Sequence, residues 1–407
     1  MSEPAIIPLT TLDPAAPLDD LTWLDQVVGD ARVVAIGESA HYNAESYLLR
    51  HRVLRYLAER HGFSAYAMES GFTEGWLTDG WVRGGDEHTV DEAMGVGMTS
   101  LMGFWTQMRG QLEWMRGSGV HYYGVDNPGS NASLLPGIDA ITAYLGGDVD
   151  PALRETAAIY AAASPFSVMQ AIGDYAELPE ERRDAVTAML AELVERTADQ
   201  KDEPAVQSLR LTASLDAMIR EMVRGNPDGA VFGIREVAMA DSVEWILRQE
   251  GRIVLAAHNG HVQRWPITMP GTAPATTLGM HLAERLGADY VVIGTTTGEG
   301  ETLNTGPDFY TGKLFTELGP PEEGTLDALM AASRDGAFAT DLRRLPPADA
   351  KLVEAADRQR LGAVTSPVRA LDAYDVLVHL PHVTAADPDA GALACAPAEV
   401  QTAFTPT

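Results

Sequence analysis

Short apolar runs alternate with longer amphipathic stretches through most of the chain. Each run has the length of a buried strand, and residues 44–61 repeat apolar side chains at i and i+4, which predicts a helix. A strand–helix–strand order favours parallel strands joined by right-handed crossovers. The six runs expected as strands are 33–36, 65–68, 120–125, 252–256, 289–293 and 376–380.

The stretch from 131 to 229 carries no convincing strand pattern. It is rich in Ala, Leu and Glu and is broken by glycine and proline, with Pro227 near its end. We therefore predict an α/β fold whose largely parallel central sheet is flanked by helices, with residues 131–229 as an all-helical insertion and candidate lid. The α/β catalytic core comprises residues 1–130 and 230–382, and the small, polar residues 383–407 predict a flexible tail.

Two other patterns look like ligand-binding features but have simpler structural explanations. Residues 72–118 are expected to be mainly helical, and apolar residues three and four apart between Leu101 and Met115 indicate a face packed in the core. The glycine-bearing stretch 294–300 lacks the lysine of a phosphate-binding loop and the dinucleotide spacing. We interpret it as a turn at a strand end, beside the pocket.

The charge and the cysteine content exclude several classes of partner. The 407-residue chain has 29 Lys and Arg against 58 Asp and Glu, and its formal net charge of −29 would repel nucleic acid and anionic membranes. The only cysteine is Cys395, so no internal disulfide can form, which fits a reducing compartment. No secretory signal or bilayer-spanning run is evident. We expect a cytoplasmic protein whose partner is a small-molecule substrate, with the oligomeric state left open.

Polar side chains suited to proton transfer follow four of the predicted strands. The carboxyl ends of parallel strands lie at one edge of a sheet, where ligands gather in α/β proteins. Each residue has a structural alternative: the first glutamate could cap a helix, the second could pair with an arginine, and the histidines could bind backbone. Considered together, two glutamates and two histidines at matching positions favour a site. The residues are Glu38, His41, Glu69, Asp126, Asn127, His258 and His261.

This set of side chains suits hydrolysis of an ester by direct attack of water. A histidine is a good general base near neutral pH, and a neighbouring carboxylate holds its tautomer and favours the imidazolium. A second histidine or an arginine could stabilise the oxyanion. Ser39 as nucleophile is a weaker alternative because the Gly-x-Ser-x-Gly elbow is absent. Glutamate and histidine could also hold a divalent ion, but we expect neither a metal nor another cofactor.

These motifs resemble the erythromycin esterase family, which also includes proteins labelled succinoglycan biosynthesis. The resemblance covers most of residues 30–380, and its more specific parts are 33–41 and 256–261. Ala257 and the unmatched helical insertion depart from the family pattern, so the scaffold and catalytic set carry over better than the substrate. Other matching positions are Glu45, Arg50, 65–69, Trp114, Arg116, Arg235, Met239, Ala240, Tyr374 and Asp375.

The resemblance implies an α/β core with a helical insertion, and hydrolysis of a macrolide lactone without a metal. It places the base on His41, assisted by Glu38 and Glu69, with His258 in the site. The expected catalytic residues are therefore His41, Glu38, Glu69 and His258, and the expected substrate-binding residues are Arg50, His261, Asp126, Asn127 and Arg235.

Three functions are compatible with such a site. The first is hydrolysis of a cyclic or linear ester, with His41 activating water. The second keeps the same acid–base residues but catalyses a cyclisation, elimination or epimerisation of a natural-product intermediate. The third is a non-catalytic protein that binds a hydrophobic metabolite.

Overall fold

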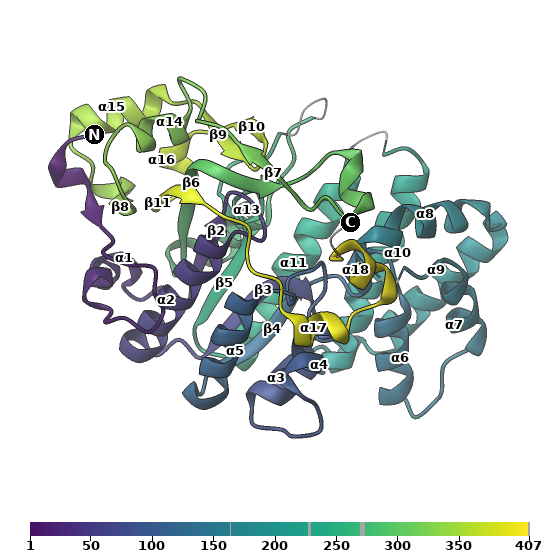
Figure 1. Ribbon diagram of the computed structural model, residues 1–407. Coiled ribbons are helices and arrows are strands. Elements are labelled where there is room, and N and C mark those ends of the chain that lie inside the picture. Colours follow the sequence, from purple (N-terminus) through teal and green to yellow (C-terminus); the bar gives the residue numbers. More distant parts are fainter. Residues whose placement is uncertain (163, 227–228, 269–272, 406–407) are drawn as a thin grey trace. The chain divides into compact units, whose positions relative to one another are not determined.

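The computed structural model describes residues 1–405 except 163, 227–228 and 269–272, so the break expected at Pro227 lies outside the described residues (Figure 1). The chain forms two compact units, each assembled from segments that are distant in sequence. The first unit comprises Met1–Tyr66, Trp105–Gln111 and Glu250–Asp387, and the second comprises Ala67–Phe104, Leu112–Gln249 and Pro388–Thr407.

The first unit is built on a mixed sheet that is parallel at its centre. Strands β11, β6, β2 and β5 run parallel to one another, whereas β8, β1 and β7 are added antiparallel. All six residues of β2 are buried, which is typical of a parallel strand covered on both faces. The strands are β1 (Ile7–Pro8), β2 (Val33–Glu38), β5 (Ile253–His258), β6 (Tyr290–Leu303), β7 (Phe315–Leu318), β8 (Phe338–Asp341) and β11 (Val376–Val383).

Helices contact this sheet along much of its length. Helix α2 spans Ala44–His61 as predicted, and it ends where Gly62 adopts a left-handed conformation with φ 68°. A separate two-stranded sheet joins β9 (Arg358–Leu361) to β10 (Val364–Pro367). The remaining helices of this unit are α1 (Leu24–Val28), α12 (Asn259–Val262), α13 (Leu278–Leu286), α14 (Leu326–Ala331), α15 (Pro347–Ala355) and α16 (Ala370–Ala373).

The second unit combines two strands with many helices. Strand β3 (Ala65–Gly71), which begins in the first unit, pairs with β4 (His121–Asp126). The described residues between 131 and 226 form helices and no strand, as the sequence pattern predicts. The helices are α3 (Gly75–Val82), α4 (Val90–Gly95), α6 (Leu135–Tyr144), α7 (Pro151–Ala157), α8 (Val168–Glu177), α9 (Glu180–Arg196), α10 (Pro204–Val223) and α11 (Ala230–Gln249). Helix α5 (Thr106–Ser118) begins in the first unit and continues in the second from Leu112.

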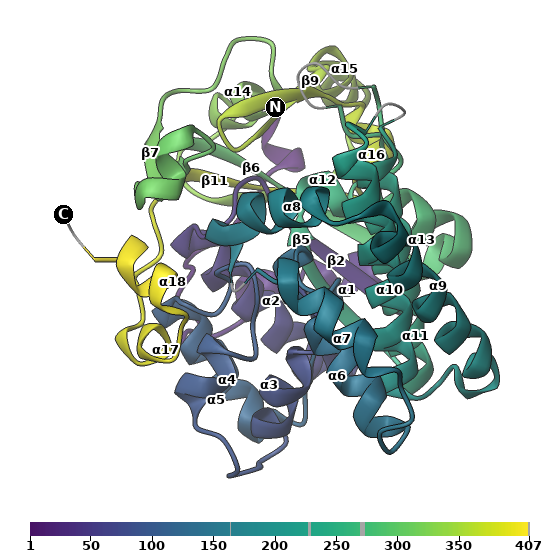
Figure 2. The ribbon, with the colours of Figure 1, turned by 90° about the vertical axis from the view of Figure 1, so that its right-hand side faces the viewer.

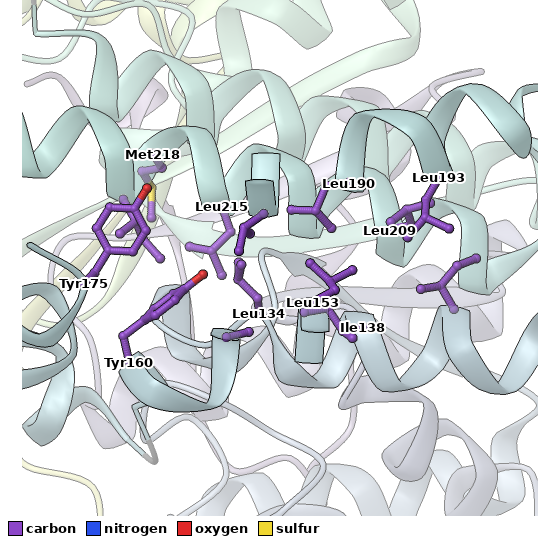
Figure 3. Packing of buried hydrophobic residues seen from close by; sticks show 14 of the residues in the cluster. Leu134, Ile138, Leu153, Tyr160, Tyr175, Leu190, Leu193, Leu209, Leu215 and Met218 are labelled. Carbon is purple, nitrogen blue, oxygen red and sulfur yellow. The ribbon is translucent and has the colours of Figure 1, made fainter. Parts of the chain in front are cut away.

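The helical part of the second unit has its own hydrophobic core. Helices α6, α7, α9 and α10 lie side by side, and leucines from all four meet between them (Figures 2 and 3). Leu153, Leu209 and Leu215 are fully buried. Each such side chain contributes roughly 1.5–3 kcal/mol of stability by leaving water. The helical stretch is therefore held by packing of its apolar faces.

One local prediction differs from the structure. The stretch 294–300 is not a turn but the continuation of β6, because Gly298 and Gly300 let that strand approach β11 closely. A Cβ at Gly298 would lie 2.0 Å from the Pro381 carbonyl oxygen, so no larger residue fits there. The predicted flexible tail contains two short helices, α17 (Ala390–Ala394) and α18 (Ala398–Ala403). The flexibility of residues 383–407, the domain boundaries and the lid motion stay predictions.

Candidate active site

The first group of predicted site residues lies where β2 ends. Strand β2 finishes at Glu38, and the chain turns through Tyr42, whose φ of 65° is left-handed, before α2 begins. Gly37 is required in the strand because a Cβ there would lie 2.0 Å from the Asn259 side-chain oxygen. Pairing of β2 with β6 ends at Ile36, and Asn259 binds the backbone N–H and C=O of Thr295 beyond it. This divergence of the two strands leads the chain out of the sheet at Glu38.

Glu38 and His41 form a close carboxylate–imidazole pair. Glu38 Oε1 lies 2.6 Å from His41 Nδ1, and Glu38 Oε2 lies 2.8 Å from Arg50 Nη1. The side chains of Glu38 and Arg50 are each 1% exposed, whereas that of His41 is 21% exposed. The imidazole is therefore the member of this pair that solvent can reach.

Burial and neighbouring charges act in opposite directions on Glu38. Burial on its own would raise the pKa of this carboxyl, but the Arg50 guanidinium and the hydrogen bond from His41 outweigh it and lower the pKa. Glu38 is thus ionised at neutral pH and accepts the Nδ1–H of His41. In that tautomer Nδ1 carries the proton and Nε2 carries the lone pair of the ring.

His258 lies beside Glu38 in the sheet and is held by backbone groups. The two residues are register partners on parallel strands β2 and β5, and the His41 and His258 rings are 5.0 Å apart. The N–H of Gly260 donates to His258 Nδ1 at 3.1 Å, so His258 Nε2 carries the proton and donates to the Ser39 carbonyl at 3.0 Å. These two contacts fix the tautomer and the ring orientation of His258.

Arg50 and His261 complete the group in the first unit. Arg50 Nη2 donates to the Ala257 carbonyl at 2.9 Å, which ties the glutamate–histidine pair to the residue before His258. Arg50 is buried and bound to Glu38, so its position supports that carboxylate, and the substrate-binding role expected of Arg50 stays a prediction. His261 is buried on α12, with its ring 6.4 Å from that of His258.

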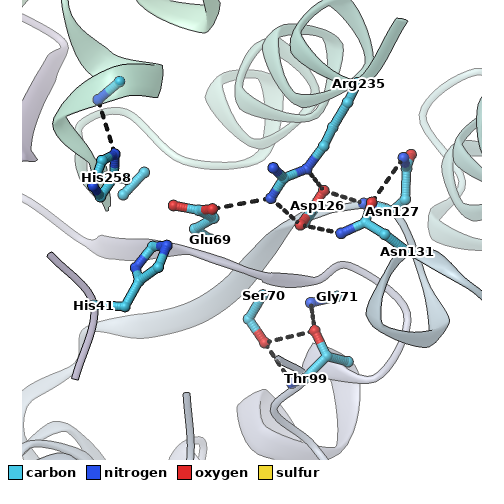
Figure 4. Close-up of polar contacts among 12 residues, drawn as sticks. His41, Glu69, Ser70, Gly71, Thr99, Asp126, Asn127, Asn131, Arg235 and His258 are labelled. Atoms are coloured by element: carbon cyan, nitrogen blue, oxygen red, sulfur yellow. Dashed lines mark hydrogen bonds and ion pairs between the residues drawn. The ribbon is translucent and has the colours of Figure 1, made fainter. Parts of the chain in front are cut away.

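The second group of predicted residues gathers around Arg235 in the second unit (Figure 4). Arg235 projects from α11 and binds Asp126 through Nε at 2.9 Å and Nη2 at 2.7 Å. Nη2 also lies 2.9 Å from Glu69 Oε1 at the end of β3. Burial would lower the pKa of Arg235, but Asp126 and Glu69 raise it above the ordinary value. The guanidinium is permanently charged between two carboxylates.

Asn127 and Asn131 extend this cluster. The Asn131 amide donates to Asp126 Oδ2 at 2.8 Å, and the Asn127 amide donates to Asn131 Oδ1 at 3.1 Å. Sequence reasoning missed Asn131, although the polar turn 126–131 was a signal, since asparagine tolerates the left-handed φ of 63° found there. The structure thus brings Glu69, Asp126, Asn127 and Arg235 together, as it does Glu38, His41, Arg50, His258 and His261.

Comparisons with known proteins identify the family. Residues 58–383 match the family model described as erythromycin esterase. The chain belongs to the erythromycin esterase family. That match contains Glu69 and His258 and begins after Glu38 and His41. Family membership identifies the protein as an enzyme of the esterase class.

Curated relatives agree with this assignment, and solved structures share the fold. The chain is 27% identical over 351 residues to the erythromycin esterase type II of Escherichia coli, covering 79% of this chain and 83% of that protein. It is 25% identical over 290 residues to the type I enzyme of Escherichia coli, covering 65% and 70%. A mutant erythromycin esterase in an open conformation shares the fold, with a TM-score of 0.75, 21% identity and coverage of 92% and 97%. A succinoglycan biosynthesis protein aligns with a TM-score of 0.76, 21% identity and coverage of 94% and 96%.

Two absences among the described residues bear on membranes and metals. No helix among them is long and apolar enough to cross a bilayer. No group of three or more His, Cys, Asp or Glu within the described part of the chain is arranged to hold a metal ion.

Proposed function

We propose that the protein hydrolyses a macrolide-like ester or lactone, with His41 as the general base that activates water. The observation that carries the proposal is the 2.6 Å contact between Glu38 and His41, with Glu38 buried and ionised beside Arg50. The names of the curated relatives, erythromycin esterases of types I and II, support the substrate class. The cytoplasmic location and the absence of a nucleic-acid or membrane partner remain expectations from composition.

The proposed reaction needs no covalent enzyme intermediate. His41 Nε2 accepts a proton from water as the water oxygen attacks the ester carbonyl, and Glu38 stabilises the resulting imidazolium. When the tetrahedral intermediate collapses, the carbonyl-to-alkoxy bond breaks and the imidazolium returns the proton to the leaving oxygen. A lactone would therefore open to a hydroxy acid with the gain of one water.

The other residues have supporting roles in this proposal. Arg50 keeps Glu38 ionised, and the fixed tautomer of His258 holds the Ser39 carbonyl next to the pair. Glu69 is proposed as catalytic from the sequence motif, and its ion pair with Arg235 supports an ionised state. Asp126, Asn127, Arg235 and His261 are proposed to bind substrate.

The test is incubation of the purified protein with a panel of macrolides in oxygen-18 water, followed by mass spectrometry. One added water, with oxygen-18 in the acid group, supports hydrolysis. An isomeric product without added water would instead favour cyclisation, elimination or epimerisation. Tight binding without a product would favour the non-catalytic alternative. Activity is expected to survive prolonged treatment with a chelator.

A pair of histidine variants tests the assigned base. His41→Ala is expected to lower kcat by about a thousandfold, because proton transfer by a positioned base accounts for a factor of that order. His61→Ala is the matched control, since His61 also pairs with a carboxylate, Asp25, at 2.8 Å, but lies at the C-terminal end of α2. Equal activity in the two variants, with circular dichroism unchanged, would exclude His41 as the base.

A further inference from the structure

A cavity of about 540 Å³ lies within the second unit and is not used by the proposed reaction. It is bordered by α4, the turn after β4, the start of α6 and the C-terminal helices α17 and α18. Its volume is within the roughly 300–1,000 Å³ typical of small-molecule sites. Neither Glu69, Asp126 nor Arg235 lines it, and Glu38 and His41 belong to the other unit. The cavity therefore requires its own explanation.

The wall of this cavity is mostly apolar and carries no positive charge. Its apolar side chains include Val96, Met98, Phe104 and Val400, and serine hydroxyls account for most of the polar groups. None of the described residues that line it is Lys, Arg or His. Transfer of an ionised carboxylate or phosphate into such surroundings without a partner is costly, so the wall disfavours anionic ligands.

Glu74 is the single carboxyl group in that wall. Its Oε1 accepts a hydrogen bond from the Gly129 N–H at 2.7 Å, and its Oε2 is buried with no hydrogen-bond partner among the described residues. Burial raises the pKa of Glu74 to about 7; the Gly129 hydrogen bond opposes this rise, and Asp126 adds to it. A buried acceptor left unsatisfied carries a desolvation penalty that a ligand donor would remove.

We propose that this cavity binds an apolar molecule carrying one hydrogen-bond donor, an amine or a hydroxyl, with Glu74 as the acceptor. The apolar body fills the space between α4 and the C-terminal helices, and the donor reaches the carboxyl group by a small rotation of the Glu74 side chain. This site is separate from the esterase chemistry, and its existence does not depend on the proposed hydrolysis.

Three probes with the same apolar body and different head groups test the proposal. We would titrate the whole protein with adamantylamine, adamantanol and adamantane carboxylate by calorimetry at pH 8. The amine and the alcohol are expected to bind, and the carboxylate is expected to bind at least about tenfold more weakly than either. The methyl NMR signal of Met98, assigned with Met98→Leu, reports whether a bound probe occupies this cavity.

Variants test separately the role of Glu74 as acceptor and the occupancy of the cavity. Glu74→Gln is expected to weaken the amine at least about tenfold, whereas Asp216→Asn, a buried carboxyl of the same unit that does not line the cavity, is expected to change nothing. Val96→Trp, at a 49% exposed position on the cavity wall, is expected to block all probes without unfolding the protein. Equal affinity for the three head groups, or no shift of the Met98 signal, would overturn the proposal.

Discussion

Each unit contains a buried carboxylate bound to an arginine, but the third partner differs. In the first unit Glu38 lies between Arg50 and His41, so one carboxylate contacts both a permanent cation and a titratable base. In the second unit Arg235 lies between Asp126 and Glu69, so one guanidinium serves two carboxylates. The first cluster can gain a proton with the carboxylate already in place to balance the charge. The second cluster contains the Arg235 guanidinium, which stays positively charged at every physiological pH.

This difference teaches that composition alone does not tell a proton-transfer site from an anchoring site. Both clusters follow strand ends, and both contain the residue types that suggest acid–base chemistry. What distinguishes the first cluster is His41, a partner of Glu38 that can titrate near neutral pH. We therefore expect the first cluster to govern proton transfer, and the Asp126–Arg235 pair of the second cluster to govern stability and the placement of Glu69.

The largest expected effect comes from Glu38→Gln. The amide can donate to His41 Nδ1 and reverse its tautomer, and it cannot balance an imidazolium, so kcat should fall by about a thousandfold. Steady-state kinetics with a macrolide that the panel shows to be hydrolysed measures the loss. Glu45→Gln is the matched control, because Glu45 binds the Thr384 backbone and hydroxyl instead of a histidine. A Glu38→Gln enzyme with more than a tenth of normal kcat would contradict the assignment.

Removing the cation of the second cluster should cost mainly stability. Arg235→Met leaves Asp126 and Glu69 without their guanidinium, and breaking a buried pair in this way typically costs about 3–5 kcal/mol. Urea denaturation measures the change. Arg248→Met, on the same helix but in an exposed pair with Asp202, should stay within about 0.5 kcal/mol of the parent protein. If both variants were equally stable, the second cluster would not be an anchor.

Glu74 extends the comparison to a carboxyl with neither histidine nor arginine. Its folded pKa of about 7 lies above the ordinary 4.5, so the folded protein binds more protons between these values and stability falls as pH rises through that window. Glu74→Gln should remove this cost, which is about 3 kcal/mol above pH 7. Thermal unfolding at pH 5 and pH 8 should show the variant gaining stability over the parent only at the higher pH. A parallel shift at both values would contradict the raised pKa.

The smallest expected effect concerns Arg50. Because Arg50 lowers the pKa of Glu38, Arg50→Gln should raise that pKa, whereas Arg50→Lys should largely keep it low. The pKa of Glu38 is lower in the folded protein than in the unfolded chain, where it is near 4.5. The lowered pKa therefore stabilises the folded protein at pH values above 4.5, and this stability is lost as pH falls through the folded pKa. As pH falls, the Arg50→Gln variant should therefore lose this stability and its kcat at a higher pH than the parent protein does. Carbon-13 NMR titration of the Glu38 carboxyl measures the shift, and identical titrations of all three proteins would refute it.

The central strands and the first long helix could be predicted because their signals are local. Four consecutive apolar residues followed by Gly37 mark β2, and helix α2 runs over the predicted residues 44–61. The elements between 304 and 375 escaped prediction, since short strands such as β8 and β9 are stabilised by neighbours that lie far away in sequence. The prediction of a turn at 294–300 was wrong for the same reason. The glycines there allow close contact with β11, which no local sequence pattern reveals.

The candidate residues could be found from the sequence more easily than their roles. Strand ends pointed to Glu38, His41, Glu69 and His258 without any knowledge of their partners. The burial of Arg50 and the two backbone bonds that fix the tautomer of His258 depend on the folded arrangement of β2, β5 and α2. Which side chain contacts which backbone atom is decided by tertiary packing, and a spacing rule carries no such information.

The pairing of Glu38 with His258 across β2 and β5 makes the chemistry sensitive to alignment as well as to residue identity. Side chains alternate between the two faces of a strand, so a slip of one position would place Ala257 opposite Glu38 and turn the imidazole to the other face. A substitution along these strands changes one side chain and leaves the pairing of the strands intact. A single inserted or deleted residue within 253–258 does not, and divergence of such enzymes should therefore proceed by exchange of side chains here and by changes of length elsewhere.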